Sequence, residues 1–275
     1  LGYNIVHLMF KGPEKNLTET VHCQPAMLVC DLAYFEVLRE KISPSLFLGH
    51  SAGEYAAAVA SGAISEEKAI MLIKERAIAM KKCIPKEGVQ PGTSYMAAII
   101  NYDLKNIKEI CERVSEPGNI VQIANINSPF QIIISGNNKA VIRVVDEINA
   151  LNEKGVMTKY LPVEGPFHSK LMREAKETLK KDLEKIIINE PQIPYISNHS
   201  ASLITESSQV KPELIEQIPN PVLWYPSIEL AIKKGVIIFI ECGPGNVQTN
   251  LLTKIGKKYH KEITVLNPKD YLCFG

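Results

Sequence analysis

One serine of this chain stands in a sequence context that suits nucleophilic chemistry. Ser51 lies in GHSAG, residues 49–53, after a short apolar run and before an alanine-rich run. A Gly-x-Ser-x-Gly segment between a strand and a helix forms a sharp turn that exposes the serine hydroxyl at the helix N-terminus. In such a turn Gly49 and Gly53 remove colliding side chains, and the amide of Ala52 points to where an oxyanion would form. The pattern predicts a nucleophile, and an ordinary structural turn is the alternative.

A nucleophilic serine needs a base, and histidine is the commonest one. Among the six histidines, His168 follows Gly165 and Pro166 and stands at the start of a predicted helix, residues 169–187. The positive end of a helix dipole would there disfavour imidazolium and keep the ring neutral and able to accept a proton. His50 adjoins the serine, but adjacent side chains point apart, so we expect it to line the pocket. A plain surface or core role is the alternative for His168.

An arginine interrupts the apolar face of the predicted helix 66–82. With about 100° per residue, the apolar side chains form one stripe, and Arg76 falls inside it while the lysines fall outside. A buried guanidinium is costly unless it meets an anion. That anion could be an internal Asp or Glu, or a substrate carboxylate held by two parallel hydrogen bonds. Because Arg76 follows Ser51 by 25 residues, the next helix could return it to the serine.

Composition and charge exclude several classes of protein. Of the 275 residues, 45% are hydrophobic and 22% are charged, and the net charge is +1. These values are ordinary for a globular protein and give no field that would attract nucleic acid or a membrane surface. No apolar run approaches the ~18 residues of a membrane span. Six cysteines without a Cys-x-x-Cys pair argue against a metal or redox site and favour a reducing, cytoplasmic setting. The lysines at 254, 257, 258 and 261 are typical of a solvated face.

Short apolar runs alternate with helical patterns along the chain, which predicts an α/β fold. We expect strands at residues 45–49, 96–100, 119–125, 131–135, 156–163, 193–197 and 236–241. We expect helices at residues 24–41, 53–61, 66–82, 104–114, 138–152, 169–187 and 227–234.

One stretch of the chain has its own order of elements. Residues 96–163 read strand, helix, strand, strand, helix, strand, which is typical of a ferredoxin-like unit. Turn-forming residues precede and follow this stretch. We therefore expect a small subdomain, residues 94–163, inserted into a larger α/β subdomain made of residues 1–93 and 164–275.

Several segments together resemble the malonyl-CoA:acyl carrier protein transacylase family, which includes the acyltransferase domains of polyketide synthases. The segments are QPAML (24–28), GHSAGEYAAAVASGAIS (49–65), ERAIAM around Arg76, MAAII (96–100), NINSPFQIIISG (125–136), GPFHS (165–169), NPVLW (220–224) and ECGPGNVQTNLL (241–252). They follow the family order along nearly the whole chain. The resemblance implies a hydrolase-like core with a parallel sheet and an inserted ferredoxin-like subdomain.

The resemblance also implies a reaction and the residues that perform it. A malonyl group would pass from malonyl-CoA to Ser51 and then to the phosphopantetheine thiol of an acyl carrier protein. His168 would be the base, and Arg76 would bind the substrate carboxylate. A backbone carbonyl would orient the histidine in place of a triad acid, and we expect it in the GPGNVQ loop, near residues 246–248.

The resemblance further implies a pocket and a substrate preference. The pocket residues are Ala52, as an oxyanion amide, and His50, Asn127 and Gln24. Phe167 resembles a bulky residue that fills the space of an α-methyl branch, although Pro166 stands where the family usually has alanine. No bound cofactor or metal is expected, because the phosphopantetheine belongs to the partner protein.

One departure from the family pattern leaves alternatives open. The family begins with a strand and a Gly-Gln-Gly loop, and the first residues of this chain resemble the segment after that strand. We therefore expect a missing N-terminal segment and a central sheet that lacks one strand. The alternatives to malonyl transfer are an acyl hydrolase that clears acyl groups from carrier proteins, which would gain nothing from Arg76, and an inactive relative that serves as a scaffold. An unrelated lipase-like hydrolase is disfavoured because no HGGG-type segment is present.

Overall fold

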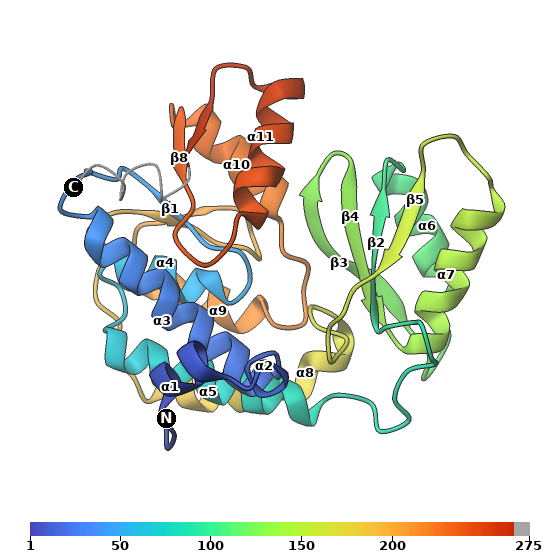
Figure 1. The fold of residues 1–275 in the computed structure, drawn as a ribbon, viewed down its shortest axis with the longest axis horizontal. Coiled ribbons are helices and arrows are strands. Elements are labelled where there is room, and N and C mark those ends of the chain that lie inside the picture. Colours follow the sequence, from blue (N-terminus) through green and yellow to red (C-terminus); the bar gives the residue numbers. More distant parts are fainter. Residues whose placement is uncertain (267–275) are drawn as a thin grey trace.

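Helices and strands alternate along the part of the chain that the structure describes, residues 1–266 (Figure 1). The structure is a computed structural model. Its α-helices are α1 (Ile5–Lys11), α2 (Glu14–Leu17), α3 (Thr20–Leu38), α4 (Gly53–Ala60), α5 (Glu66–Lys82), α6 (Leu104–Val114), α7 (Asn138–Ala150), α8 (Arg173–Glu184), α9 (Ser207–Glu216), α10 (Trp224–Lys233) and α11 (Val247–Tyr259). A 3₁₀-helix, η1 (Lys170–Met172), precedes α8. The strands are β1 (Phe47–Leu48), β2 (Met96–Ile100), β3 (Val121–Ser128), β4 (Gln131–Gly136), β5 (Met157–Tyr160), β6 (Tyr195–Ile196), β7 (Leu203–Ile204), β8 (Ile238–Ile240) and β9 (Thr264–Leu266). The predicted α/β fold class is confirmed.

The strands of the larger part of the molecule form two separate hydrogen-bonded sheets. β1 pairs in parallel with β6, which pairs antiparallel with β7, and β8 pairs in parallel with β9. Within residues 1–266, β1 and β8 each have a strand neighbour on one side only. The parallel pairings agree with the expected parallel sheet, whereas the antiparallel β7 and the division into two sheets do not. Both sheets nevertheless contribute to one hydrophobic cluster, in which Leu48 and Ile196 pack with Phe239.

A four-stranded antiparallel sheet with the order β3-β4-β2-β5 occupies the other part of the molecule (Figure 1). Side chains alternate across the sheet, so Ile99 and Ile134 pack against α6 and α7 on one face. On the opposite face, Ala98 and Ile133 pack with Phe167, which belongs to the segment that follows β5. This sheet therefore supports the segment that carries His168.

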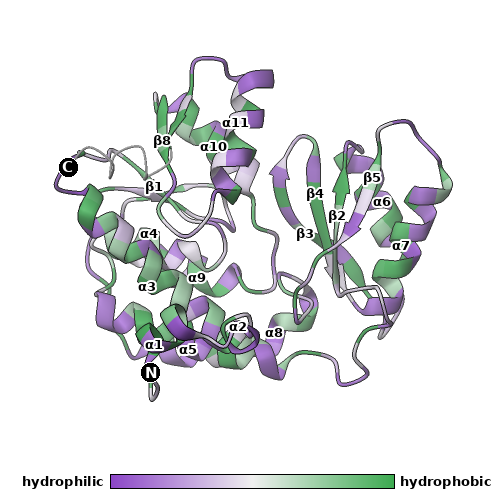
Figure 2. Ribbon diagram, viewed as in Figure 1, coloured by the Kyte–Doolittle hydropathy of each residue, from purple (hydrophilic) through white to green (hydrophobic). Residues whose placement is uncertain are grey.

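The helices α3, α4, α5, α8 and α9 share the largest hydrophobic cluster of the described residues, and their apolar stretches are visible in Figure 2. Leu28, Tyr55, Ile73 and Leu179 are among its fully or almost fully buried members. α5 spans the predicted residues 66–82, because Ser65 caps its first turn and accepts a hydrogen bond from the amide of Lys68. This packing fixes α4, which follows Ser51, and α5, which carries Arg76.

Some element boundaries differ from the sequence prediction. α3 begins at Thr20 and ends at Leu38, so Pro25 lies inside the helix near its start. The predicted helix 169–187 begins as an α-helix only at Arg173, after η1, and β1 has only two residues. The elements that the prediction missed are α1, α2, α9, α11, β7 and β9. α9 and α11 have buried apolar side chains, such as Leu214 of α9, whereas α1 and α2 have no buried residue.

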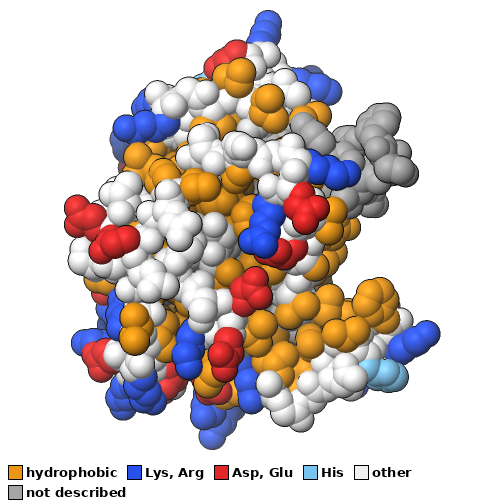
Figure 3. Space-filling model, turned by 90° about the vertical axis from the view of Figure 1, so that its left-hand side faces the viewer, with side chains coloured by type: hydrophobic (Ala, Val, Ile, Leu, Met, Phe, Trp, Pro, Cys, Tyr) orange, Lys and Arg blue, Asp and Glu red, His pale blue; other side chains and the backbone are white. Residues whose placement is uncertain are grey.

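The surface mixes charged and hydrophobic side chains. α1 leaves Val6 and Phe10 exposed, and Figure 3 shows hydrophobic side chains gathered on the side of the molecule where α1 and α3 lie. The lysines at 254, 257, 258 and 261 are all exposed, as expected for a solvated face. The five cysteines within residues 1–266 are free, and Cys273 lies outside the described residues. No helix in this part of the chain is both long and apolar enough to cross a membrane.

Candidate active site

The turn between β1 and α4 holds Ser51 in a left-handed backbone conformation, with a φ of 53°. Residues other than glycine seldom adopt this conformation, and it is expected where a sharp turn presents a nucleophile. A Cβ atom at Gly49 would lie 2.0 Å from the carbonyl oxygen of Gly53, so only glycine fits at that position. Nothing lies within 4 Å of the Cβ position of Gly53, so the predicted collision at this second glycine is wrong.

Asn198, in the loop between β6 and β7, clamps the serine turn. Its side-chain oxygen accepts a hydrogen bond from the amide of Ser51, and its side-chain nitrogen donates to the carbonyl of Gly49, both at 2.6 Å. The amide of Ala52 donates to no acceptor within residues 1–266, so its N–H group is not committed to the fold. The sequence analysis missed Asn198, because it lies 147 residues from Ser51 and belongs to no recognisable motif.

The imidazole of His168 reaches the serine hydroxyl. Its Nε2 atom lies 2.7 Å from Ser51 Oγ, and its Nδ1 atom donates to the backbone carbonyl of Gln217 at 3.0 Å. Since a carbonyl only accepts, Nδ1 carries the proton and Nε2 presents its lone pair to the hydroxyl. The expected source of this carbonyl, residues 246–248, is wrong: the residue that follows α9 supplies it instead.

His168 is held in its neutral form mainly by burial. Its side chain is only 3% exposed, and burial together with the nearby Arg76 guanidinium lowers the pKa of His168 to about 3. The predicted cause, a helix dipole, is not the principal one, because α8 begins only at Arg173 and η1 stands between. The consequence that the sequence predicted is unchanged: the ring is neutral and can accept a proton.

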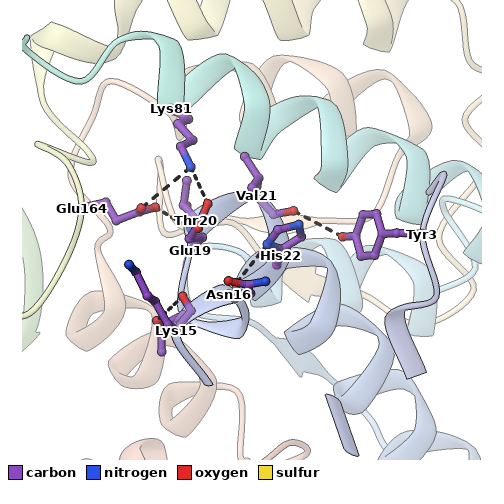
Figure 4. Close-up of polar contacts among 10 residues, drawn as sticks. Tyr3, Lys15, Asn16, Glu19, Thr20, Val21, His22, Lys81 and Glu164 are labelled. Carbon is purple, nitrogen blue, oxygen red and sulfur yellow. Dashed lines mark hydrogen bonds and ion pairs between the residues drawn. The ribbon is translucent and has the colours of Figure 1, made fainter. Parts of the chain in front are cut away.

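Polar contacts anchor the segment that carries His168. Before it, Glu164 accepts a hydrogen bond at 2.6 Å from the amide of Thr20, the first residue of α3, and Lys81 of α5 approaches the same carboxylate at 4.0 Å (Figure 4). From β3, the side chain of Gln122 donates to the carbonyl of His168 at 3.3 Å. His168 itself has a φ of 56°, so these contacts hold a backbone conformation that is unfavourable in isolation.

Arg76 is 1% exposed, and its guanidinium lies beside the serine. Nη2 donates to Ser51 Oγ at 3.2 Å and to Gln217 Oε1 at 2.9 Å, while Nη1 donates to Gln24 Oε1. The ring of Tyr55 lies 5.8 Å from the guanidinium carbon. No ion pair among residues 1–266 includes Arg76, so the internal salt bridge that was the alternative does not form.

Two residues that the sequence analysis missed complete this network. The side-chain nitrogen of Gln217 donates to the carbonyl of Ser51 at 2.9 Å and to Glu54 Oε2 at 2.6 Å. Glu54 lies in the first turn of α4 and is fully buried. Glu54 directly follows GHSAG, which is the one signal that could have drawn attention to it, whereas Gln217 belongs to no motif.

The remaining predicted pocket residues lie in two places. Gln24 contacts Arg76 directly, as described above. His50 Nε2 lies 2.9 Å from Asn127 Oδ1, and the His50 ring packs edge-on against Trp224 with 5.3 Å between ring centroids. His50 is adjacent to Ser51 in the chain, so this second group begins beside the serine turn. Asn127 belongs to β3, so the four-stranded sheet contributes to the same site.

Among the described residues, no group of three or more His, Cys, Asp and Glu side chains is arranged to hold a metal ion. The site therefore combines a hydroxyl, a neutral imidazole and a buried guanidinium, all drawn from distant parts of the chain. These are the elements of acyl transfer through a serine ester.

The sequence matches the family model described as acyl transferase domain over residues 1–267. The chain belongs to the acyl transferase family. This acyl transferase is 39% identical over 265 residues to the malonyl CoA-acyl carrier protein transacylase of Bacillus subtilis, and the match covers 95% of this chain and 80% of the relative.

Solved structures share the fold of this acyl transferase. The malonyl CoA-acyl carrier protein transacylase of Coxiella burnetii has a TM-score of 0.88 and 34% identity, covering 96% of this chain and 81% of that chain. A malonyl-transacylase solved in complex with its type II polyketide synthase acyl carrier protein has a TM-score of 0.87 and 34% identity, covering 97% and 83% of the two chains. The resemblance that the sequence motifs indicated is thereby confirmed.

Proposed function

We propose that this acyl transferase moves a malonyl group from malonyl-CoA to the phosphopantetheine thiol of an acyl carrier protein through an ester on Ser51. One observation carries the proposal: Ser51 Oγ lies within hydrogen-bond distance of both a base and a cation, His168 Nε2 at 2.7 Å and Arg76 Nη2 at 3.2 Å. The named activities of the relatives, and the carrier protein bound to one of them, support the same donor and acceptor.

The mechanism is a double displacement. Ser51 Oγ attacks the thioester carbonyl while His168 Nε2 takes its proton, and the backbone carbonyl of Gln217 stabilises the imidazolium through Nδ1. The oxyanion of the tetrahedral intermediate accepts a hydrogen bond from the N–H of Ala52, which has no acceptor within residues 1–266. When the carbon–sulfur bond breaks, His168 returns the proton to the coenzyme A thiolate. The carrier-protein thiol then attacks the serine ester with His168 again as the base, which regenerates Ser51.

Arg76 selects acyl groups that end in a carboxylate. A guanidinium can hold a carboxylate through two parallel hydrogen bonds, and desolvation strengthens this pairing. The hydrogen bonds to Gln24 and Gln217 fix its plane beside the serine. This arrangement distinguishes malonyl transfer from the hydrolysis of neutral acyl groups, which would not use a buried cation. The side chains of His50 and Asn127 form another wall of the pocket.

The chain consists of two subdomains that meet beside the site. We assign residues 94–163 to a ferredoxin-like small subdomain and residues 1–93 and 164–275 to a hydrolase-like large one. The strand order β3-β4-β2-β5 with two helices on one face supports the assignment for the small subdomain. Backbone hydrogen bonds between β3 and Val222, at 2.8 and 2.9 Å, join the two parts beside the site.

Radiolabelled malonyl-CoA tests the proposal directly. The purified protein should retain label in an acid-stable ester on Ser51, and adding a phosphopantetheinylated carrier protein should move the label onto the carrier thiol. Ser51→Ala should retain none. Label that appears only as free malonate, with or without the carrier protein, would instead support the hydrolase. Carrier-protein binding without any labelling would support the scaffold.

A further inference from the structure

Glu54 is a buried acid that the mechanism above does not use. Its side chain is fully buried, and it forms no ion pair among the described residues. Its Oε1 atom has no hydrogen-bond partner there, whereas Oε2 accepts from the side chain of Gln217 at 2.6 Å and from the amide of Asn198 at 3.2 Å. Glutamates are almost never fully buried without a compensating partner, so this position requires an explanation.

The contacts of Gln217 provide one. Its amide oxygen accepts from Arg76 Nη2 at 2.9 Å, and its amide nitrogen donates to Glu54 and to the carbonyl of Ser51. The reverse orientation of this amide would place its N–H₂ group against the guanidinium and its oxygen against two acceptors. Donors would then face donors and acceptors would face acceptors. Glu54 therefore helps to decide which end of the amide faces Arg76.

We propose that Glu54 is a positioning residue that fixes the Gln217 amide, and through it the Arg76 guanidinium, in the orientation that selects carboxylate-bearing acyl groups. The inference rests on the proposed function, because it concerns how the cation of that site is held. Glu54 does not contact the guanidinium itself, since no hydrogen bond or ion pair joins the two side chains.

The hydrogen bond from Gln217 to Glu54 needs an acceptor oxygen at Oε2 but does not need a negative charge on the carboxyl group. Burial raises the pKa of Glu54 to about 8, so the carboxyl group is largely protonated near neutral pH. Because Oε2 accepts from both Gln217 and Asn198, the proton resides on Oε1 and Oε2 remains an acceptor. Glutamine has the same shape, is also neutral and offers one acceptor oxygen to Gln217 and Asn198. Leucine fills a similar volume but offers no acceptor. Glu54→Gln and Glu54→Leu therefore separate the hydrogen bond from the packing.

The test compares the rates at which malonyl-CoA and acetyl-CoA acylate Ser51 in the full chain. Glu54→Leu should lower the malonyl-to-acetyl ratio about tenfold, which is equivalent to about 1.4 kcal/mol, and Glu54→Gln should restore it. A merely structural role would lower both rates by the same factor and leave the ratio unchanged. Glu213→Leu is the matched control: this acid on α9 accepts a hydrogen bond from Ser197 and forms none with the Gln217 side chain, so its loss should leave the ratio unchanged.

Two further variants keep the test decisive. Gln217→Leu retains the backbone carbonyl that accepts from His168 but removes the amide, so it should lower the ratio even if Glu54→Leu does not fold. The double variant should lower the ratio no further than either single variant, because both remove the same link. Additive losses, an unchanged ratio in Gln217→Leu, or a failure of Glu54→Gln to restore the ratio would each overturn the inference.

Arg76→Ala separates this inference from the proposed function. If Arg76→Ala leaves the ratio unchanged, the carboxylate role of Arg76 in the proposed function is wrong, and the inference about Glu54 is overturned with it. If Arg76→Ala abolishes the preference for malonyl-CoA while Glu54→Leu and Gln217→Leu preserve it, the proposed function stands and only the positioning role of Glu54 is overturned.

Discussion

The base of the proposed reaction should remain functional in acid. An ordinary histidine, with a pKa of about 6.5, is only about 3% neutral at pH 5. Burial and the Arg76 guanidinium lower the pKa of His168 to about 3, which leaves about 99% of the ring neutral at that pH. Because only the neutral ring can accept the proton of Ser51, the two cases differ about 30-fold in the fraction of competent enzyme at pH 5.

A rapid-quench measurement of Ser51 acylation by radiolabelled malonyl-CoA between pH 5 and pH 8 distinguishes these cases. Acidifying the enzyme only at the moment of mixing limits exposure to low pH, and circular dichroism of the same samples reports whether the fold survives. We expect the acylation rate at pH 5 to stay within about twofold of the rate at pH 7.5, as follows from the depressed pKa.

A rate that falls tenfold for each pH unit below about 6.5, in protein that remains folded, would refute the reasoning. It would mean that water or a conformational change relieves the burial of His168 before the proton moves. Arg76→Ala provides an internal check, because it removes the second cause of the shift. Measured with acetyl-CoA, which has no carboxylate for Arg76 to bind, the acylation rate of this variant should begin to fall at a higher pH than that of the wild type, but still below the pH expected for an exposed histidine.

Two further predictions follow from the serine turn. Gly49→Ala should prevent folding of the turn and abolish acylation, because its Cβ would lie 2.0 Å from a backbone oxygen. Gly53→Ala should fold, because nothing lies within 4 Å of its Cβ. Thermal unfolding and radiolabelling of both variants check this, and equal losses in the two variants would contradict it. Burial raises the pKa of Glu54 to about 8, so between about pH 5 and pH 8 the folded state holds a proton that the unfolded state has lost. As the pH rises through this range, the wild type should therefore lose about 1.4 kcal/mol of unfolding free energy per pH unit relative to Glu54→Gln. Urea unfolding of both proteins across this range measures the difference, and parallel stability curves would show that Glu54 is ionised in the folded state.

Local sequence determined the elements on which the site is built. The Gly-x-Ser-x-Gly segment, the apolar stripe that Arg76 interrupts and the capped helix 66–82 depend on residues close together in the chain, so their patterns were readable. The segments 104–114 and 138–152 became α6 and α7 almost as predicted, for the same reason. The helices α9 and α11 were missed. Each contains a residue that disfavours a helix interior, Pro212 in α9 and Gly256 in α11, and tertiary packing buries Leu214 and Ile255.

Only the tertiary structure decided how the functional groups are held. Asn198, Gln217 and Glu54 are ordinary polar residues in sequence, and their roles arise from hydrogen bonds that join positions up to 166 residues apart. The carbonyl that orients His168 comes from the end of α9, and no local pattern distinguishes one backbone carbonyl from another. The depressed pKa of His168 likewise comes from burial among several elements. Residue types and short spacings specify which chemistry is available, whereas solvation and long-range hydrogen bonding, which depend on the complete fold, specify how that chemistry is oriented and charged.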